Sequence, residues 1–97
     1  MARTAVGFIE AEGFVPVFDA VDAMTKSTEV DVRGVVRLGG GLVAVAVSGD
    51  LATVEEAVEI GEETARAISG RGVKSVVFAS PAEPIVALAG DITLIGS

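Results

Sequence analysis

The residue types that carry out most enzyme chemistry are missing from this sequence. Its 97 residues include no cysteine, no histidine, no tryptophan and no tyrosine. Without cysteine there is no thiolate nucleophile, no disulfide and no Cys-based zinc or iron–sulfur site. Without histidine, the commonest general base and the commonest metal ligand are lacking. We therefore expect neither an enzyme nor a bound cofactor or metal.

Carboxylates are the strongest remaining candidates for acid–base or metal chemistry. Glu10 and Glu12 form a catalytic pair only if both face one pocket, and the sequence shows no partner group. A second acidic group has helical spacing and comprises Glu55, Glu56, Glu59, Glu62 and Glu63. Metal sites usually draw their ligands from several elements, so this spacing favours the solvated face of a helix over a metal site.

Three consecutive glycines, Gly39, Gly40 and Gly41, form the most unusual motif. A phosphate-binding loop would lead from a strand into a helix, whereas the segment after Gly41 reads as a strand. The motif therefore predicts a hairpin turn. Two alternatives remain: a turn alone, or a turn whose backbone amides also face something at close range.

Two arginines and one lysine are the cations of most interest. Arg33 and Arg37 lie four residues apart on a predicted strand, so they project from the same face of the sheet. They either pair with nearby carboxylates, which is the reading we favour for Arg33, or line an anion route beside the glycines. From its position alone, Lys26 is a solvated cation at the end of a helix.

Composition points to self-association rather than to nucleic acid or lipid. Seven Lys and Arg face fourteen Asp and Glu, a net charge of -7, whereas nucleic acid and anionic membranes require clustered cations. Hydrophobic residues make up 51% of the chain, yet no stretch reaches the length of a membrane-spanning helix. Because a small domain has little interior in which to bury apolar area, we expect part of it to be buried between subunits.

Hydrophobic periodicity predicts six elements. They are a strand over Thr4–Glu10, a helix over Phe14–Ser27, a strand over Val30–Leu38, a strand over Leu42–Ser48, a helix over Leu51–Ser69 and a strand over Val73–Ala79. A short helix and an extended tail are expected within Pro84–Ser97. Either Asp50 or a Thr53–Glu56 capping box begins the second helix.

Each predicted element has an apolar face. In the first helix it comprises Phe14, Val17, Phe18, Val21 and Met24, and in the second it comprises Leu51, Val54, Ala57, Val58, Ala65 and Ile68. In the second strand, alternation places Val30, Val32, Gly34, Val36 and Leu38 on one face. The order β-α-β-β-α-β predicts an α+β, ferredoxin-like split βαβ fold, with both helices on one face of a four-stranded antiparallel sheet and a short C-terminal segment.

Several motifs together resemble the single-domain, hexamer-forming type of bacterial microcompartment (BMC) shell protein. They are Gly7-Phe8-Ile9-Glu10, Gly13-Phe14-Val15, Asp22-Ala23-Met24-Thr25-Lys26, Gly39-Gly40-Gly41-Leu42-Val43 and Gly49-Asp50. The resemblance implies a single BMC domain over residues 1–97, with its core at about 5–81 and a C-terminal tail at 82–97. It also implies a location in a microcompartment shell within the bacterial cytoplasm.

The resemblance assigns roles to particular residues. Cyclic hexamers of the family tile edge to edge into a shell around a set of enzymes. The segment matching Gly39, Gly40 and Gly41 surrounds the sixfold axis and lines a pore for small metabolites. Gly40 would be the main pore-lining residue, Arg37 would add positive charge near one mouth, and Lys26 would lie at the hexamer edge.

One departure from the family's pattern concerns the contact between hexamers. Family members usually carry a Pro-Arg-Pro segment after the last strand, and its arginine helps to lock neighbouring hexamers together. This chain has Ser80 at that position, and Val76 and Ala82 replace the histidines that often flank the segment. We expect the hexamer to be retained and the strength of edge-to-edge assembly to change.

The leading functional prediction is thus a structural shell subunit, with other shell proteins, enclosed enzymes and small polar metabolites as partners. The alternative is a small ferredoxin-like regulatory oligomer that binds an anion or nucleotide at the glycine loop. A small enzyme that uses paired carboxylates is the least favoured alternative.

Overall fold

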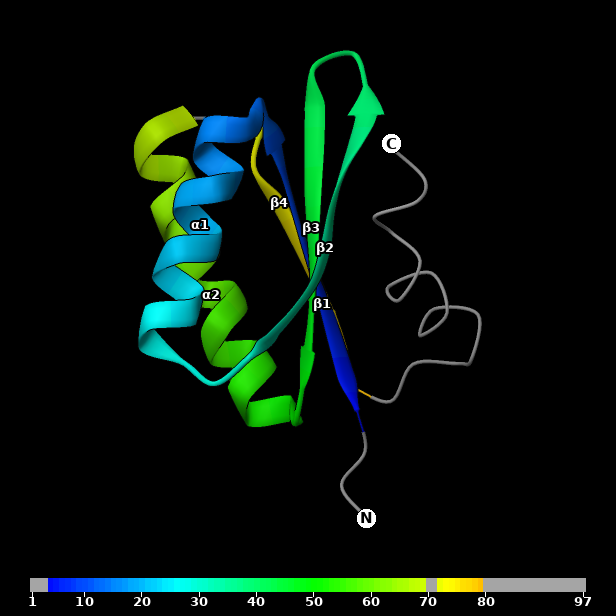
Figure 1. The fold of residues 1–97 in the computed structure, drawn as a ribbon, viewed down its shortest axis with the longest axis vertical. Coiled ribbons are helices and arrows are strands. Elements are labelled where there is room, and N and C mark those ends of the chain that lie inside the picture. The colour runs from blue at the N-terminus through cyan, green and yellow to red at the C-terminus, as the bar shows by residue number, and fades with distance from the viewer. Residues whose placement is uncertain (1–3, 70–71, 80–97) are drawn as a thin grey trace.

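The computed structural model describes residues 4–69 and 72–79, which form two layers, a sheet and a pair of helices (Figure 1). The elements are β1 (Ala5–Glu12), α1 (Phe14–Ser27), β2 (Asp31–Gly39), β3 (Leu42–Gly49), α2 (Leu51–Ser69) and β4 (Lys74–Phe78). The β-α-β-β-α-β order is therefore confirmed. The segment predicted for Pro84–Ser97 lies outside the described residues.

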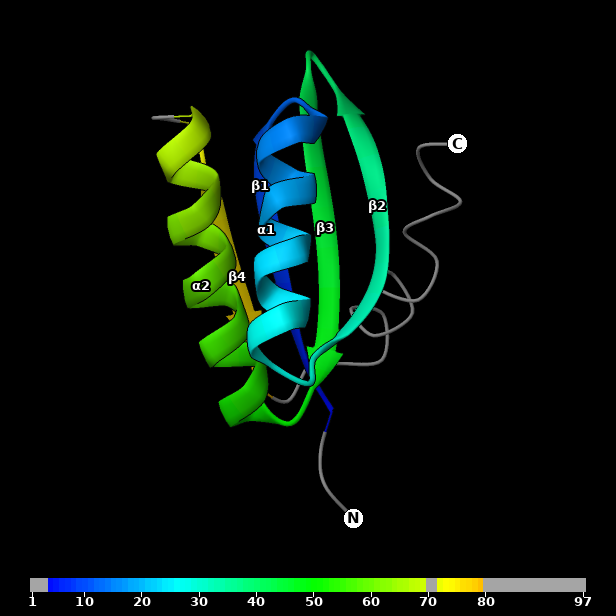
Figure 2. The same cartoon turned by 60° about the vertical axis from the view of Figure 1, so that its left-hand side comes forward.

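The four strands form one antiparallel sheet in the order β2-β3-β1-β4. Both helices lie on the same face, α1 alongside α2, as Figure 2 shows. Strands β2 and β4 are the two edges of the sheet. This is the predicted α+β architecture.

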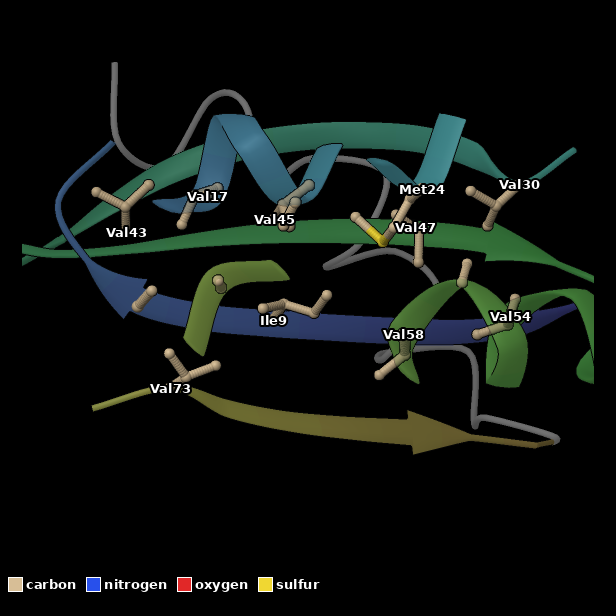
Figure 3. Packing of buried hydrophobic residues seen from close by; sticks show 14 of the residues in the cluster. Ile9, Val17, Met24, Val30, Val43, Val45, Val47, Val54, Val58 and Val73 are labelled. Atoms are coloured by element: carbon tan, nitrogen blue, oxygen red, sulfur yellow. The ribbon is translucent and has the colours of Figure 1, made fainter. Parts of the chain in front are cut away.

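The main core lies between the helices and the sheet. Ile9 of β1, Met24 of α1 and Val54 of α2 are fully buried there (Figure 3). The three helix-facing valines of β3, Val43, Val45 and Val47, join them. A second, smaller cluster lies on the opposite face of the sheet and includes Val6 and Ala46. Strand β3 is thus buried on both faces, which explains its nearly uninterrupted apolar sequence.

The predicted apolar stripe of α2 is largely confirmed, since Val54, Ala57, Val58 and Ala65 are buried. The predicted stripe of α1 is confirmed only in part, at Val17 and Met24. The buried residues of α1 are Pro16, Val17, Ala20 and Met24, while Phe14 and Phe18 are exposed. In α2, Leu51 and Ile68 are exposed as well. The small residues Ala20 and Gly61 face the interior, since they allow the two helices and the sheet to approach closely.

The predicted alternation in β2 is wrong at Val32. The register with β3 shifts between Val32 and Gly34, so Val32 pairs with Val47 on the helix side, whereas Gly34 and Val36 lie on the opposite face. An extra residue in one strand of a pair, a β-bulge, resets the alternation at that point. A second register shift lies between Arg37 and Gly39.

Helix α2 begins at Asp50 rather than at a Thr53–Glu56 capping box. The backbone N–H of Thr53 donates to Asp50 Oδ1 at 2.9 Å, and the Thr53 hydroxyl donates to Asp50 Oδ2 at 3.0 Å. These two bonds hold the pKa of Asp50 below its ordinary value. Asp50 is therefore the N-cap residue.

Candidate functional site: the glycine hairpin and the far end of helix α1

The three glycines close the hairpin between β2 and β3. Gly39 pairs with Leu42, so Gly40 and Gly41 are the two central residues of the turn. Their φ angles are +63° and +84°, and positive φ at both central positions is the signature of a type I′ turn. Gly39 has a φ of +92° beside the second register shift. Backbone conformation therefore accounts for all three glycines.

The tip of the hairpin is open on its outer side. A Cβ atom added at Gly39, Gly40 or Gly41 would meet no atom within 4 Å. One contact anchors the turn to the rest of the fold, because the backbone N–H of Gly13 donates to the Gly41 carbonyl at 2.8 Å. Gly13 immediately precedes α1, so the hairpin is held against the start of that helix.

A cavity of about 220 Å³ lies at the base of the hairpin. It is lined by Gly13, Phe14, Arg37, Gly39, Gly41, Leu42 and Val43. Arg37 pairs with Val43, which belongs to the helix-side core, so Arg37 lies on the helix side of the sheet. Within the described residues it has no ion-pair partner. The structure thus brings Arg37 and the glycines to one place.

Lys26 is in the last turn of α1, at the opposite end of the molecule from the hairpin (Figure 1). Its ammonium lies 3.0 Å from Asp22 Oδ2, an i, i+4 ion pair. The Lys26 side chain is 73% exposed, so this pair is solvated and contributes little to stability. The principal axes of the described fold measure 38, 27 and 18 Å, and the hairpin and Lys26 lie near the two ends of the long one. Ser80 lies outside the described residues.

The carboxylates that were weighed as alternative sites show few contacts in the described part of the chain. Glu10 and Glu12 have no hydrogen-bond or ion-pair partner among the described residues. In residues 4–69 and 72–79, no three acidic side chains are grouped as metal ligands would be. The helices of this part are also not long and apolar enough to cross a membrane.

One polar contact that sequence reasoning missed links α2 to β4. The Ser75 hydroxyl donates to Glu62 Oε2 at 2.5 Å, and Arg66 donates to Glu62 Oε1 and to the Val73 carbonyl. The pKa of Glu62 is held below its ordinary value mainly by the hydrogen bond from Ser75 and, to a smaller extent, by the hydrogen bond from Arg66. The i, i+4 spacing of Glu62 and Arg66 was readable in the sequence, but Ser75 is thirteen residues from Glu62.

The described residues thus present an open turn beside a cavity with a cation at one end of the molecule, and a solvated lysine at the other end. Such surfaces are suited to contacts with other molecules.

Comparison with known proteins identifies a family. The BMC domain family matches residues 5–81. The carboxysome shell protein CcmK2 of Thermosynechococcus vestitus is 40% identical over 80 residues, which is 81% of this chain and 78% of that protein. The carboxysome shell protein CsoS1 of Prochlorococcus marinus is 35% identical over 92 residues, which is 95% of this chain and 89% of that protein.

A solved structure agrees with these relatives. A microcompartments protein from Desulfitobacterium hafniense superposes with a TM-score of 0.78 at 25% identity and covers 95% of this chain. The chain spans 49%, about half, of the length of that neighbour. The fold and the sequence of this chain agree with these relatives, and the chain therefore belongs to the BMC domain family.

Proposed function

We propose that this chain forms a cyclic hexamer, and that these hexamers tile with other shell proteins into the layer that encloses a set of enzymes. The structural shell role itself, within the bacterial cytoplasm, follows from family membership. The observation that carries the proposal is the family match over residues 5–81, combined with 35–40% identity to carboxysome shell proteins.

The shape of the subunit supports a radial arrangement in the ring. Hexamers of the family place the loop that matches Gly39, Gly40 and Gly41 at the sixfold axis. In this chain the hairpin is at one end of the long axis and the last turn of α1, with Lys26, is at the other. A subunit that points its hairpin at the axis therefore presents Lys26 at the outer edge, as the proposal requires.

The pore of the proposed hexamer would be lined by backbone rather than by side chains. Six copies of Gly40 surround the axis, and Gly39 and Gly41 flank them. Because no atoms lie within 4 Å of their missing Cβ positions, the turn itself places no protein atoms on its outer side. Backbone N–H groups together with the nearby Arg37 favour small polar or anionic solutes over cations.

We further propose that the subunit has no catalytic activity of its own. The chain contains no histidine or cysteine, and its curated relatives are named as shell proteins. The alternative of a regulatory oligomer that binds a nucleotide at the glycines is not favoured. The glycines lead from β2 into β3 and not into a helix, unlike the glycines of a phosphate-binding loop.

The mass of the purified protein by light scattering, followed by negative-stain imaging of a concentrated sample, tests the proposal. We expect a mass near six subunits of 9.7 kDa and hexagonal particles or arrays. Discrete hexamers without arrays would support the hexamer and attribute the weaker tiling to Ser80. A monomer or trimer at all concentrations would overturn the hexamer and the pore together.

A further inference from the structure

A carboxylate lies beside the glycine hairpin, on the strand that pairs with β3. Glu12 is the last residue of β1, and its Cα pairs with that of Leu42, which follows the turn. Gly13, the next residue, donates its backbone N–H to the Gly41 carbonyl at 2.8 Å. Strand β1 therefore ends and α1 begins at the base of the hairpin (Figure 1). Glu12 is one residue from the contact that anchors the turn.

Glu12 and Arg37 lie on opposite faces of the sheet. Side chains alternate along a strand, and Ala11 is fully buried on the helix side. Glu12 therefore belongs to the face away from the helices, where it is exposed. Arg37 lies on the helix side, because it pairs with Val43 of the main core. At the hairpin end of the subunit, the sheet separates the cation from the carboxylate.

The start of α1 adds to the positive charge on the helix side. Gly13 is the N-cap of α1 and supplies no side-chain acceptor, and the first turn of the helix carries no acidic residue. The free N–H groups of that turn form the positive end of the helix dipole. Gly13 and Phe14 line the same cavity as Arg37. The helix side of the hairpin is therefore positive.

The carboxylate of Glu12 retains its charge uncompensated. Among the described residues, neither Glu12 nor Arg37 has an ion-pair partner. The Glu12 side chain lies beside Gly72, since a Cβ there would be 3.4 Å from its Cγ and from its Oε1. Glu10 differs, although it is on the same strand and the same face. Its Cα pairs with that of Lys74 in β4, and it is two residues, about 7 Å, farther from the hairpin.

Within the proposed hexamer, these charges recur six times around the pore. The Cα atoms of an antiparallel pair such as Glu12 and Leu42 are about 5 Å apart, and Leu42 is two residues, at most about 7 Å, from Gly40. The backbone of Glu12 is thus within about 12 Å of Gly40. The Debye length is about 8 Å at physiological ionic strength, so the carboxylate acts on the turn, most strongly in dilute salt.

We infer that Glu12 determines the charge preference of the proposed pore. Its carboxylate offsets the positive potential that Arg37 and the start of α1 produce at the glycines, so the pore admits neutral polar solutes as readily as small anions. This inference rests on the proposed hexamer and narrows the class of solute that its pore passes. With Glu12 neutralised, the same hairpin would prefer anions.

Two nitroxide probes that differ in charge, the anionic carboxy-PROXYL and the neutral carbamoyl-PROXYL, measure the potential at the hairpin. The readout is the relaxation of the Gly40 and Gly41 amide protons by the anionic probe divided by that by the neutral probe, in hexamers at low ionic strength. We expect Glu12→Gln to raise this ratio about two-fold, because six negative charges near the turn are removed. Arg37→Gln should lower the ratio.

Two control variants separate the position of the charge from other effects. Glu10→Gln removes a carboxylate from the same face of the sheet and should change the ratio much less. Glu12→Asp keeps the charge and should retain the wild-type ratio. Loss of a carboxylate at the start of α1 would lower the thermal midpoint, but a purely structural role of that kind would not raise the ratio.

The outcomes distinguish this inference from the proposed function. Wild-type hexamers in which Glu12→Gln leaves the ratio unchanged, or in which Glu10→Gln raises it equally, would overturn the role of Glu12 and leave the hexamer standing. A wild-type monomer by light scattering would instead remove the proposed function itself.

Passage across an assembled layer gives a second readout. Acetate and acetamide have nearly the same size and differ in charge, so the ratio of their rates of passage reports the charge preference of the pore. We expect similar rates for wild type, a higher rate of acetate relative to acetamide for Glu12→Gln, and a lower one for Arg37→Gln. A relative rate in Glu12→Gln equal to that of wild type would contradict the inference.

Discussion

Glycine serves two different purposes in this chain. At Gly40 and Gly41 the backbone requires positive φ, and the space outside is empty. At Gly7 and Gly61 the space is full, because a Cβ there would lie 2.5 Å from Val58 Cγ2 and from Ile9 Cδ1, respectively. The first pair determines the shape of the hairpin, whereas the second determines how closely the helices approach the sheet.

The close approach at Gly7 predicts a destabilising effect of a single methyl group. Val58, Val54 and Val47 surround the position, and β-branched side chains have little rotamer freedom with which to move away. We expect Gly7→Ala to lower the free energy of unfolding by about 1–3 kcal/mol, the typical cost of overpacking a core. Urea denaturation measures it. In a Val58→Ala background the same substitution should cost little, and an equal cost there would refute the steric explanation.

The turn at Gly40 predicts that side-chain type matters more than size. Asn tolerates positive φ, and Asn-Gly is a preferred type I′ pair, so Gly40→Asn should leave thermal stability close to that of wild type. Gly40→Leu should lower stability by about 1–2 kcal/mol, the cost of a left-handed conformation for an ordinary residue. Equal midpoints in thermal unfolding for the two variants would argue against the turn assignment.

The same Asn variant also tests the pore. In the proposed hexamer, six added amides at the axis should narrow the pore without changing the mass of the particle. We expect lower passage of small polar solutes across an assembled layer of Gly40→Asn, at an unchanged mass by light scattering. Unchanged passage would place the hairpin away from the axis.

The polar contact between α2 and β4 centres on one carboxylate, that of Glu62. Its pKa is lowered in the folded state by the Ser75 and Arg66 hydrogen bonds, so the unfolded chain takes up the proton at a higher pH than the folded chain does. The contribution of ionised Glu62 to folding stability is therefore complete above the ordinary pKa of glutamate. It is lost as the pH falls through the lowered pKa of Glu62 in the folded state. Asp50, whose pKa is also lowered, acts in the same direction.

This linkage predicts a specific change in acid sensitivity. Glu62→Gln keeps a hydrogen-bond acceptor but does not titrate in this range. The thermal midpoint of the variant should fall less than that of wild type between about pH 7 and about pH 3. Glu63→Gln, an exposed neighbour with no hydrogen-bond partner in the described residues, is the matched control. A parallel decline in wild type and Glu62→Gln would show that this contact does not respond to acid.

The long axis of the molecule separates two surfaces. The hairpin lies at one end and the last turn of α1 lies at the other (Figure 1). In the proposed hexamer the hairpin faces the sixfold axis, and contacts at the outer end join neighbouring rings.

Lys26 tests the outer contact. Lys26→Asp should leave the hexamer intact and suppress sheets in negative-stain images, because the cation at the proposed edge is replaced by an anion. Loss of the hexamer itself would contradict an edge role. A second variant, Asp22→Lys with Lys26→Asp, keeps an ion pair within α1 but exchanges the positions of the acidic and the basic residue. If Lys26 acts only by stabilising the helix, that variant should form sheets normally.

Sequence patterns alone predicted the order of the elements, the hairpin at the glycines and the exposed acidic face of α2, and the motifs indicated the family. These properties are set by residues close together in the chain, where periodicity and turn chemistry act directly. The tail at 82–97 and Ser80 lie outside the described residues, so the predictions made for them remain predictions.

The inward-facing residues of those elements could be identified only from the packed fold. Val32 lies on the other face than predicted, because the bulge arises from pairing with β3. Phe14 and Phe18 are exposed, because close packing at Ala20 and Gly61 sets the rotation of α1. The Glu62–Ser75 bond likewise joins two elements whose positions follow from the sheet. Register, helix rotation and contacts between elements depend on long-range packing, and local pattern carries no direct signal of them.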